Sequence, residues 1–163
     1  MHRLILLCVL VLLGCGRRPE PEPAPAGFRK PDAPIYSSAV LETARMQGHW
    51  VQVAGFAEDP LPCGPGAVDI VAGQVHWSLC QNPEASGAAP LVPGKAGRFA
   101  VAGMQDWWVL WVDGDYRTMV IGTPSGRFGF VLNREASMPS DRAKAVRDIF
   151  KFNGYALDAL RFF

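Results

Sequence analysis

Cysteines and histidines are the side chains of this chain that could bind a metal, accept a covalent group or form disulfides. No Cys-x-x-Cys pair occurs, and His2, His49 and His76 are widely spaced, so the sequence does not predict a metal site. The motifs Gly-x-Ser-x-Gly and His-Glu-x-x-His and the phosphate-binding glycine loop are absent from the sequence. We therefore expect no catalytic residue, no cofactor and no metal, and a protein that is not an enzyme.

Cys15 lies at the end of a segment that predicts export. His2 and Arg3 give a basic start, and the apolar run at residues 4–13 is too short for a membrane-spanning helix, which needs about 20 residues. The junction Leu12-Leu13-Gly14-Cys15 resembles the lipobox of bacterial lipoproteins. That resemblance implies cleavage before Cys15 and a diacylglyceryl group on its thiol. An ordinary signal peptide with a chance cysteine is the alternative.

Prolines dominate the segment after Cys15, at positions 19, 21, 23, 25, 31 and 34. Such a segment predicts an extended, semi-rigid spacer that reaches about 50 Å. Residue 16 is Gly. In Gram-negative lipoproteins an Asp there commonly marks inner-membrane retention, so the resemblance implies a lipid-anchored protein of the outer membrane, expected on the periplasmic side. The expected organisation is a signal peptide at 1–14, a lipidated cysteine and tether at 15–35, and one domain at 36–163.

Charge and cysteine content limit the partners of this domain. The chain has 16 Lys and Arg against 15 Asp and Glu, and loss of Arg3 with the signal balances them. With no basic run, nothing predicts a nucleic-acid partner. Cys63 and Cys80 remain in a compartment that permits disulfides, and their bond would close a loop of about 18 residues, worth roughly 3 kcal/mol. Two free thiols are the alternative.

The elements that would position these residues are mostly strands. Short apolar runs recur at roughly ten-residue spacing between Gly, Pro, Asn and Asp clusters, which is typical of an antiparallel meander in a barrel or sandwich. The predicted strands are 49–56, 68–71, 75–79, 99–101, 107–112, 118–121 and 128–132. Residues 82–97 are predicted to form a long loop that contains one weak strand at 89–92. A capped amphipathic helix is predicted from 137 to 153, before a short apolar run at 157–163.

Three segments resemble the lipocalins, especially the bacterial outer-membrane lipoprotein branch related to apolipoprotein D. They are Gln47-Gly48-His49-Trp50, like the Gly-x-Trp motif, the segment WWVLWVDGDYR at 107–117, and FGFVLNR at 128–134. The resemblance implies a mainly β, antiparallel up-and-down barrel of about eight strands, with a C-terminal helix outside and a short final strand. Residues 48–134 are a tight fit for eight strands, so the barrel has either short strands or one that is degenerate or absent.

The resemblance also assigns roles to residues. Gly48, Trp50, Asp113, Tyr116 and Arg134 form the structural motif, in which Arg134 lies across the Trp50 indole at the closed end of the barrel. Period-two alternation predicts that Phe56 shares the inner face with Trp50, and that Val109 and Trp111 share it with Trp107. The family then implies a ligand cavity lined by six residues: Phe56, Trp107, Val109, Trp111, Phe128 and Phe130.

Two functions are consistent with the sequence. The first is a membrane-anchored lipocalin-like lipoprotein that binds and stores or transports small hydrophobic ligands such as fatty acids and lysophospholipids. The second is a structural or protein-interaction lipoprotein whose barrel is filled by its own tryptophans and holds no ligand. The sequence leaves open the ligand, the oligomeric state and the side of the outer membrane that the domain faces.

Overall fold

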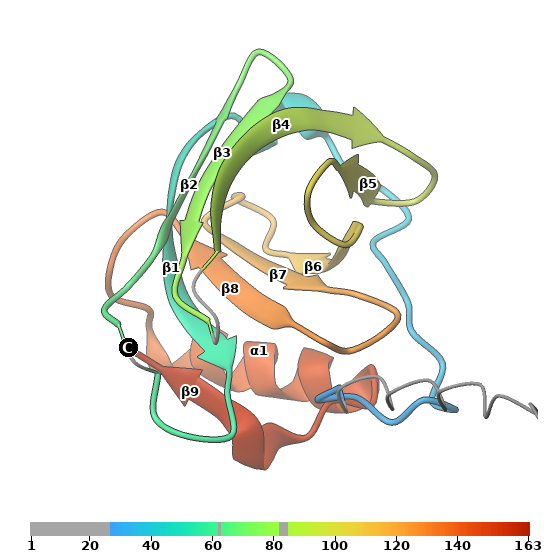
Figure 1. The fold of residues 1–163 in the computed structure, drawn as a ribbon, viewed down its shortest axis with the longest axis vertical. Helices are drawn as coiled ribbons and strands as arrows, with labels where there is room; N and C mark the ends of the chain where they lie inside the picture. The colour runs from blue at the N-terminus through green and yellow to red at the C-terminus, as the bar shows by residue number, and fades with distance from the viewer. Residues whose placement is uncertain (1–26, 62, 82–84) are drawn as a thin grey trace, which may run out of the picture.

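The computed structural model describes residues 27–61, 63–81 and 85–163. The expected signal peptide, Cys15 and the first part of the expected tether lie outside the described residues. The described chain forms nine strands and one α-helix (Figure 1), together with two short 3₁₀ helices at Thr43–Met46 and Leu157–Ala159. The bounds are β1 Gly48–Phe56, β2 Ala67–Val71, β3 Gln74–Leu79, β4 Ala85–Pro93, β5 Arg98–Val101, β6 Trp107–Val112, β7 Thr118–Gly122, β8 Gly129–Asn133, α1 Ser140–Phe152 and β9 Leu160–Phe162.

Strands β1 to β8 form a closed antiparallel ring in chain order, because β1 pairs with both β2 and β8. Residues 48–51 of β1 pair with β2, and residues 51–55 pair with β8 on the opposite edge. The short β9 pairs with residues 54–56 of β1, on the edge that β2 has left free, and so lies outside the ring. The predicted mainly β up-and-down barrel with an external helix and final strand is confirmed.

Strand β4 corrects the prediction of a long loop at 82–97. Nine residues, Ala85–Pro93, pair with β3 and then with β5, although Ala and Gly are weak strand formers. Gly87 lies directly opposite Trp77, and a Cβ at Gly87 would come within 2.5 Å of the indole ring. The absence of a side chain at Gly87 therefore makes room for Trp77, whose packing stabilises a strand that its own propensity does not favour. All eight strands of the ring are present.

Two β-bulges correct the predicted side-chain faces. In β1 the register shifts between Gln52 and Ala54, and in β6 it shifts between Val109 and Trp111. A bulge inserts one residue, so the side chains beyond it exchange faces. The predictions that Phe56 shares the inner face with Trp50 and that Trp111 shares it with Trp107 are therefore wrong.

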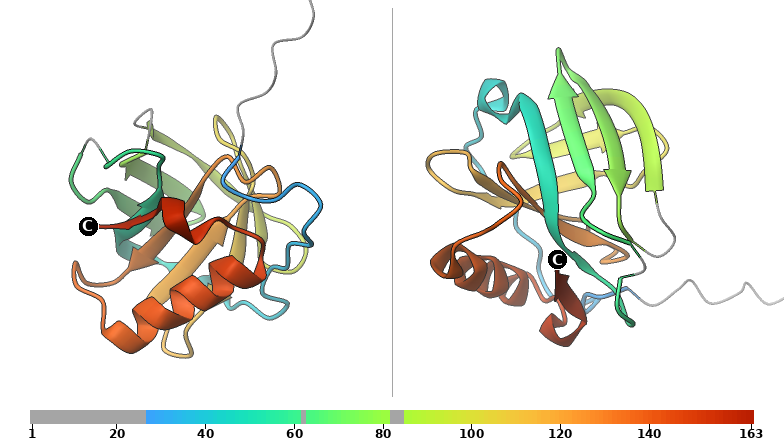
Figure 2. Two further views of the ribbon diagram at one scale, coloured as in Figure 1. Left: turned by 90° about the horizontal axis from the view of Figure 1, so that it is seen from below. Right: turned by 90° about the vertical axis from the view of Figure 1, so that its left-hand side faces the viewer.

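Apolar side chains form two layers. The inner layer fills the barrel and includes Trp50, Trp107 and Phe130. The outer layer lies between the barrel wall and α1, where Phe150 meets the ring of Phe56 edge-on at 4.8 Å between centroids. Figure 2 shows α1 lying across the outside of the strands. None of the described helices is long and apolar enough to span a membrane.

Residues 27–42, which we call the strap, run along the outside of the barrel from one end to the other (Figure 2). Phe28 forms a backbone hydrogen bond to Gly126 in the loop after β7, and the Ser38 amide donates to the Val109 carbonyl of β6. The amide of Glu42 donates to the Tyr116 hydroxyl at the far end. Residues 27–35, expected as part of the tether, thus lie against the barrel.

Candidate functional site

One end of the barrel is closed by the motif residues. The Arg134 guanidinium lies 3.6 Å from the centre of the Trp50 ring and donates hydrogen bonds to the carbonyls of Arg45, Gln47 and His49 at 2.9 Å. A further bond, at 3.3 Å, reaches the Tyr116 carbonyl. Burial lowers the pKa of Arg134. These contacts hold the 3₁₀ turn before β1 against the β6–β7 hairpin, so this end is sealed.

The other motif residues support the same end. The Asp113 carboxylate accepts hydrogen bonds from the amides of Arg117 and Thr118, both at 2.6 Å, and so shapes the turn between β6 and β7. The Tyr116 ring lies under the Arg45 guanidinium at 4.2 Å. Their contacts are with the protein's own backbone and side chains, as expected for structural residues.

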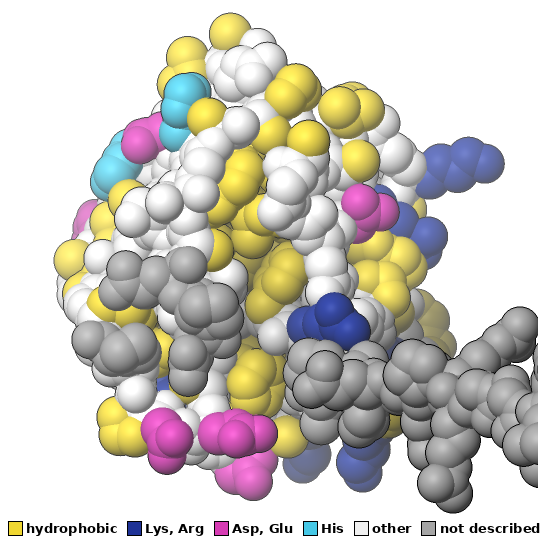
Figure 3. Space-filling view, in the orientation of Figure 1, with side chains coloured by type: hydrophobic (Ala, Val, Ile, Leu, Met, Phe, Trp, Pro, Cys, Tyr) yellow, Lys and Arg dark blue, Asp and Glu magenta, His cyan; other side chains and the backbone are white. Residues whose placement is uncertain are grey.

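The opposite end, which we call the mouth, contains a cavity of about 430 Å³. The loops after β1, β5 and β7, the end of β3 and the start of the strap surround it. Figure 3 shows this face, with apolar side chains over its centre and acidic side chains along its lower edge. The cavity is lined by Phe28, Gln52, Gly55, Phe56, Ala57, Glu58, Asp59, Cys80, Gln81, Gln105, Arg127, Phe128 and Gly129.

A row of aromatic rings connects the cavity to the inner layer. Phe128 lines the cavity and stacks on Phe130 at 5.7 Å, and Phe130 meets Trp107 edge-on at 5.2 Å. Among the described residues, Trp107 Nε1 is a buried side-chain donor without a hydrogen-bond partner. An unpaired buried donor costs free energy that a polar ligand atom would recover.

The six residues expected to line a cavity therefore lie in three places: at the cavity, in the inner layer and in the outer layer. Phe128 borders the cavity, and Trp107, Val109 and Phe130 belong to the inner layer beneath it. Phe56 packs in the outer layer, yet its ring also reaches the cavity at the mouth. Trp111 packs against the outer layer on the far side of the wall.

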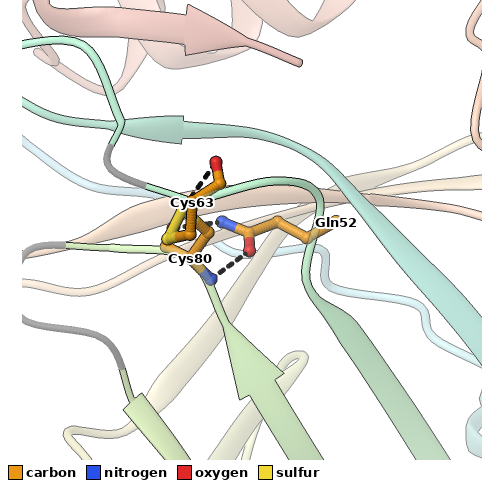
Figure 4. Close-up of a disulfide and its surroundings, with 3 residues drawn as sticks. All are labelled: Gln52, Cys63 and Cys80. Atoms are coloured by element: carbon orange, nitrogen blue, oxygen red, sulfur yellow. Dashed lines mark hydrogen bonds between the residues drawn. A yellow bond between two sulfur atoms is a disulfide. The ribbon is translucent and has the colours of Figure 1, made fainter.

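Gln52 also lines the cavity, and the sequence did not predict a role for it. Its buried side-chain amide donates to the Cys80 carbonyl at 2.9 Å and accepts from the Cys80 amide at 2.7 Å (Figure 4). These two bonds imitate a strand ladder and tie β1 to β3 at the level where β2 has not yet begun. A polar residue at an inward-facing strand position indicates a buried hydrogen bond. The sequence does not show which residue is the partner, because Cys80 is distant along the chain.

The predicted Cys63–Cys80 disulfide is confirmed, with Cα atoms 5.7 Å apart (Figure 4). It attaches the loop after β1 to the end of β3, beside the Gln52 amide. Both Cys80 and Gln52 line the cavity. The disulfide and the amide therefore fix one wall of the mouth.

Tyr155 fixes the opposite wall. Its hydroxyl accepts a hydrogen bond from the Thr123 amide at 2.9 Å and donates toward the carbonyls of Thr123 and Phe128 at 3.2 and 3.0 Å. Burial raises the pKa of Tyr155 to about 12, against smaller lowering effects of the Thr123 backbone hydrogen bond and the Arg29 charge. The loop carrying Phe128 is thus held by a neutral phenol in a buried site.

The two histidines that the structure describes, His49 and His76, do not line this cavity. His49 Nδ1 lies 2.8 Å from the Asp69 carboxylate on the outer surface of β1 and β2, so His49 has a partner that the sequence did not reveal. His76 lies opposite Asp69 on β3. Figure 3 shows both histidines beside an acidic side chain on this outer surface. Among the described residues, no group of three or more His, Cys, Asp or Glu could hold a metal.

Comparisons with known proteins agree with this geometry. Residues 96–163 match the family model of the lipocalin-like domain. The structure is similar to the crystal structure of the major allergen Per a 4 from cockroaches, with a TM-score of 0.55 and 12% identity over 82% of this chain and 94% of that one. At that identity the likeness shows a shared fold. No curated protein sequence matches the chain. The C-terminal part of the chain is thus similar to the lipocalin-like family, and the structural likeness shows a shared fold.

Proposed function

We propose that this chain is a lipid-anchored, lipocalin-like protein that binds and stores or transports small hydrophobic ligands. Fatty acids and lysophospholipids are the ligand classes that we propose. The lipocalin-like family match and the closed barrel with one sealed end support binding in the barrel. Eight strands enclose an interior wide enough for side chains or one small ligand.

The observation that carries this proposal is the cavity of about 430 Å³ at the mouth. Its volume falls within the roughly 300–1,000 Å³ of ligand sites. Phe28, Phe56 and Phe128 offer apolar surface, and Gln52, Gln105 and Arg127 offer polar groups. An amphiphile could place its acyl chain against the rings while its polar head stays at the rim. Deeper entry would bring a ligand oxygen toward the unpaired Trp107 Nε1.

The anchoring part of the proposal rests on the lipobox-like junction before Cys15 and on Gly at position 16. We propose an outer-membrane location with the domain on the periplasmic side. A Cys15→Ser variant should lose membrane association, and mass spectrometry of the wild-type N-terminal peptide should find lipid on Cys15. Membrane association of the Ser variant equal to that of wild type would reject the anchor.

Ligand binding is tested by native mass spectrometry of protein purified from membranes, followed by titration of delipidated protein with palmitate and lysophosphatidylcholine. We expect co-purified lipid and a change in tryptophan fluorescence. Phe128→Ala should weaken binding by about tenfold, because burying a phenyl ring contributes roughly 1.5–3 kcal/mol. The control Phe152→Ala removes an exposed ring from α1 and should bind as wild type does.

A second candidate function follows from the packed inner layer. Trp50, Trp107 and Phe130 are almost completely buried, which also suits a barrel filled by its own side chains. Such a protein would act as a structural or protein-interaction lipoprotein. Ligand transport is rejected if delipidated protein gives no fluorescence response to either acyl ligand and no lipid co-purifies. The protein is then a structural or protein-interaction lipoprotein with a filled barrel.

A further inference from the structure

The strap enters the domain at the mouth. Phe28 lines the cavity, and its amide and carbonyl form hydrogen bonds with Gly126 and Ala156 at 2.7 and 2.8 Å. Arg29 is buried and donates to the carbonyls of Asn153 at 2.8 Å and Pro124 at 3.0 Å. The chain therefore meets the barrel beside the cavity, at the end opposite Trp50 and Arg134.

Close packing fixes this entry point. A Cβ at Gly27 would overlap the Ser125 carbonyl oxygen, and a Cβ at Gly126 would overlap Arg29 Cβ. A Cβ at Gly154 would come within 2.5 Å of Ala33 Cβ. The three glycines allow the strap to lie directly on the loop after β7 and on the end of α1. The buried Arg29 side chain then adds hydrogen bonds to both, so the strap is part of the domain.

The remaining tether is comparable in length to the barrel, and it joins the domain at the mouth. Twelve residue steps separate Cys15 from Gly27, a span of at most about 40 Å when fully extended. The nine residues of β1 alone rise about 30 Å from the closed end toward the mouth. A lipid on Cys15 is therefore attached to the mouth end, while the closed end can lie a further barrel length away.

We propose that the mouth faces the phospholipid bilayer that holds the anchor, so that ligand passes directly between that bilayer and the cavity. This inference rests on the proposed anchoring at Cys15. The exposed rings of Tyr36 and Phe152, 5.5 Å apart, lie at the same end of α1 as the strap contact and suit the lipid–water interface. The cavity lining includes one cationic residue, Arg127, and two acidic residues, Glu58 and Asp59, so charges of both signs occur at the mouth.

The test measures the depth of two labels on the acylated full chain. Asp59→Cys places a fluorophore at the mouth, and Asp115→Cys places one at the closed end; both aspartates are exposed loop residues. The protein is reconstituted in phosphatidylcholine–phosphatidylglycerol vesicles containing nitroxide-labelled phosphatidylcholine. We expect at least threefold stronger quenching of the mouth label. Equal quenching of the two labels, or stronger quenching at Asp115→Cys, would overturn the inference.

Two variants test whether the strap sets the orientation. Gly126→Ala should release the strap, and insertion of about 30 Gly/Ser residues after Pro25 should lengthen the tether without touching the domain. Each change should bring the ratio of mouth-label quenching to closed-end-label quenching toward one. The control Gly64→Ala, where a Cβ meets nothing within 4 Å, should keep the wild-type ratio. An insertion variant that keeps the full ratio would contradict the role of the tether.

Failure of this inference can be told from failure of the proposed function. Mass spectrometry of the same preparation reports whether Cys15 carries lipid, so a missing anchor is identified before any quenching is interpreted. The quenching measurement needs no ligand. Absence of acyl binding in the titration therefore rejects the ligand proposal and leaves the orientation to be decided by the two labels.

Discussion

At the scale of single residues, the two ends of the barrel depend on different interactions. Arg134 seals the closed end by stacking on Trp50 and donating to backbone carbonyls that are distant in sequence. Tyr155 and Gln52 hold the walls of the mouth by hydrogen bonds to the backbone of other elements. In each case one polar side chain satisfies several backbone groups, so its loss leaves more than one of them unpaired.

Arg134→Ala tests the closed end. The variant loses the stacking on Trp50 and the hydrogen bonds to Arg45, Gln47 and His49, so the free energy of unfolding should fall by about 2–4 kcal/mol. Urea unfolding followed by tryptophan fluorescence measures this. The control Arg117→Ala removes exposed ion pairs and should cost about 0–1 kcal/mol. Equal losses in the two variants would contradict the assignment.

The raised pKa of Tyr155 predicts a loss of stability at alkaline pH. Its pKa is about 12 in the folded protein and about 10 when unfolded, so between these values the folded state holds a proton that the unfolded state releases. The contribution is fully present below pH 10 and decreases as the pH rises through 12, by on the order of 2–3 kcal/mol. Urea unfolding at pH 8, 10 and 11 measures it. Tyr155→Phe should be less stable than wild type at pH 8, but its free energy of unfolding should not show this decrease at alkaline pH. If the variant and wild type lose stability equally as the pH rises, the prediction is refuted.

At the scale of elements, α1 covers the barrel wall where bulges have turned side chains outward. Phe56 and Trp111 contribute to this outer layer because β1 and β6 each contain a register shift. The helix ends at Gly154 in a Schellman motif, with Tyr155 donating to the Phe150 carbonyl, and the chain then turns back toward β9. The helix thereby brings Tyr155 under the loop that carries Phe128.

Two phenylalanines of α1 make a matched pair for testing this packing. Phe150 is completely buried against Phe56, whereas Phe152, two residues later, is 67% exposed. Phe150→Ala should lower the free energy of unfolding by about 3–5 kcal/mol through the lost burial and the cavity that it leaves. Phe152→Ala should change it by less than about 0.5 kcal/mol. Chemical denaturation of the two variants compares them, and a similar cost for both would show that α1 is not docked as described.

At the scale of the whole molecule, the barrel has one sealed end and one end with a cavity. The strap joins the two ends along the outside and brings the N-terminal side of the domain to the mouth. The disulfide and the Gln52 amide close the part of the mouth where β2 is absent. The anchor, the cavity and the disulfide thus occur at one end of the molecule in the proposed arrangement.

The disulfide predicts a dependence of global stability on redox state. Cys63 and Cys80 are 17 positions apart, so replacing both by Ser should cost about 3 kcal/mol, chiefly through the freed unfolded chain. Thermal unfolding with and without reductant measures this: wild type should lose stability on reduction and the double variant should not respond. A wild-type melting temperature that is unaffected by complete reduction would count against the prediction.

Much of the fold could be predicted from local patterns. Alternating strands, the helix after Ser137, the motif around Trp50 and the even pair Cys63 and Cys80 depend on residue type and spacing, which the sequence contains. Face assignments along β1 and β6 failed because a bulge changes the side-chain period without a local sequence signal. The prediction that most of β4 is a loop failed for another reason. This strand is stabilised by Trp77 on the neighbouring strand rather than by its own residues, and the local sequence does not show that contact.

By itself the sequence determined the class of the domain and the residues of the closed end, and it predicts export and lipidation at Cys15. Only the tertiary structure decided where the cavity lies, which aromatic rings border it, and that the strap meets the barrel at the mouth. The physical reason is that these features depend on contacts between segments far apart in the chain. The Arg29 bonds to Asn153 and Pro124 and the Gln52 bonds to Cys80 exist only once the ring has closed.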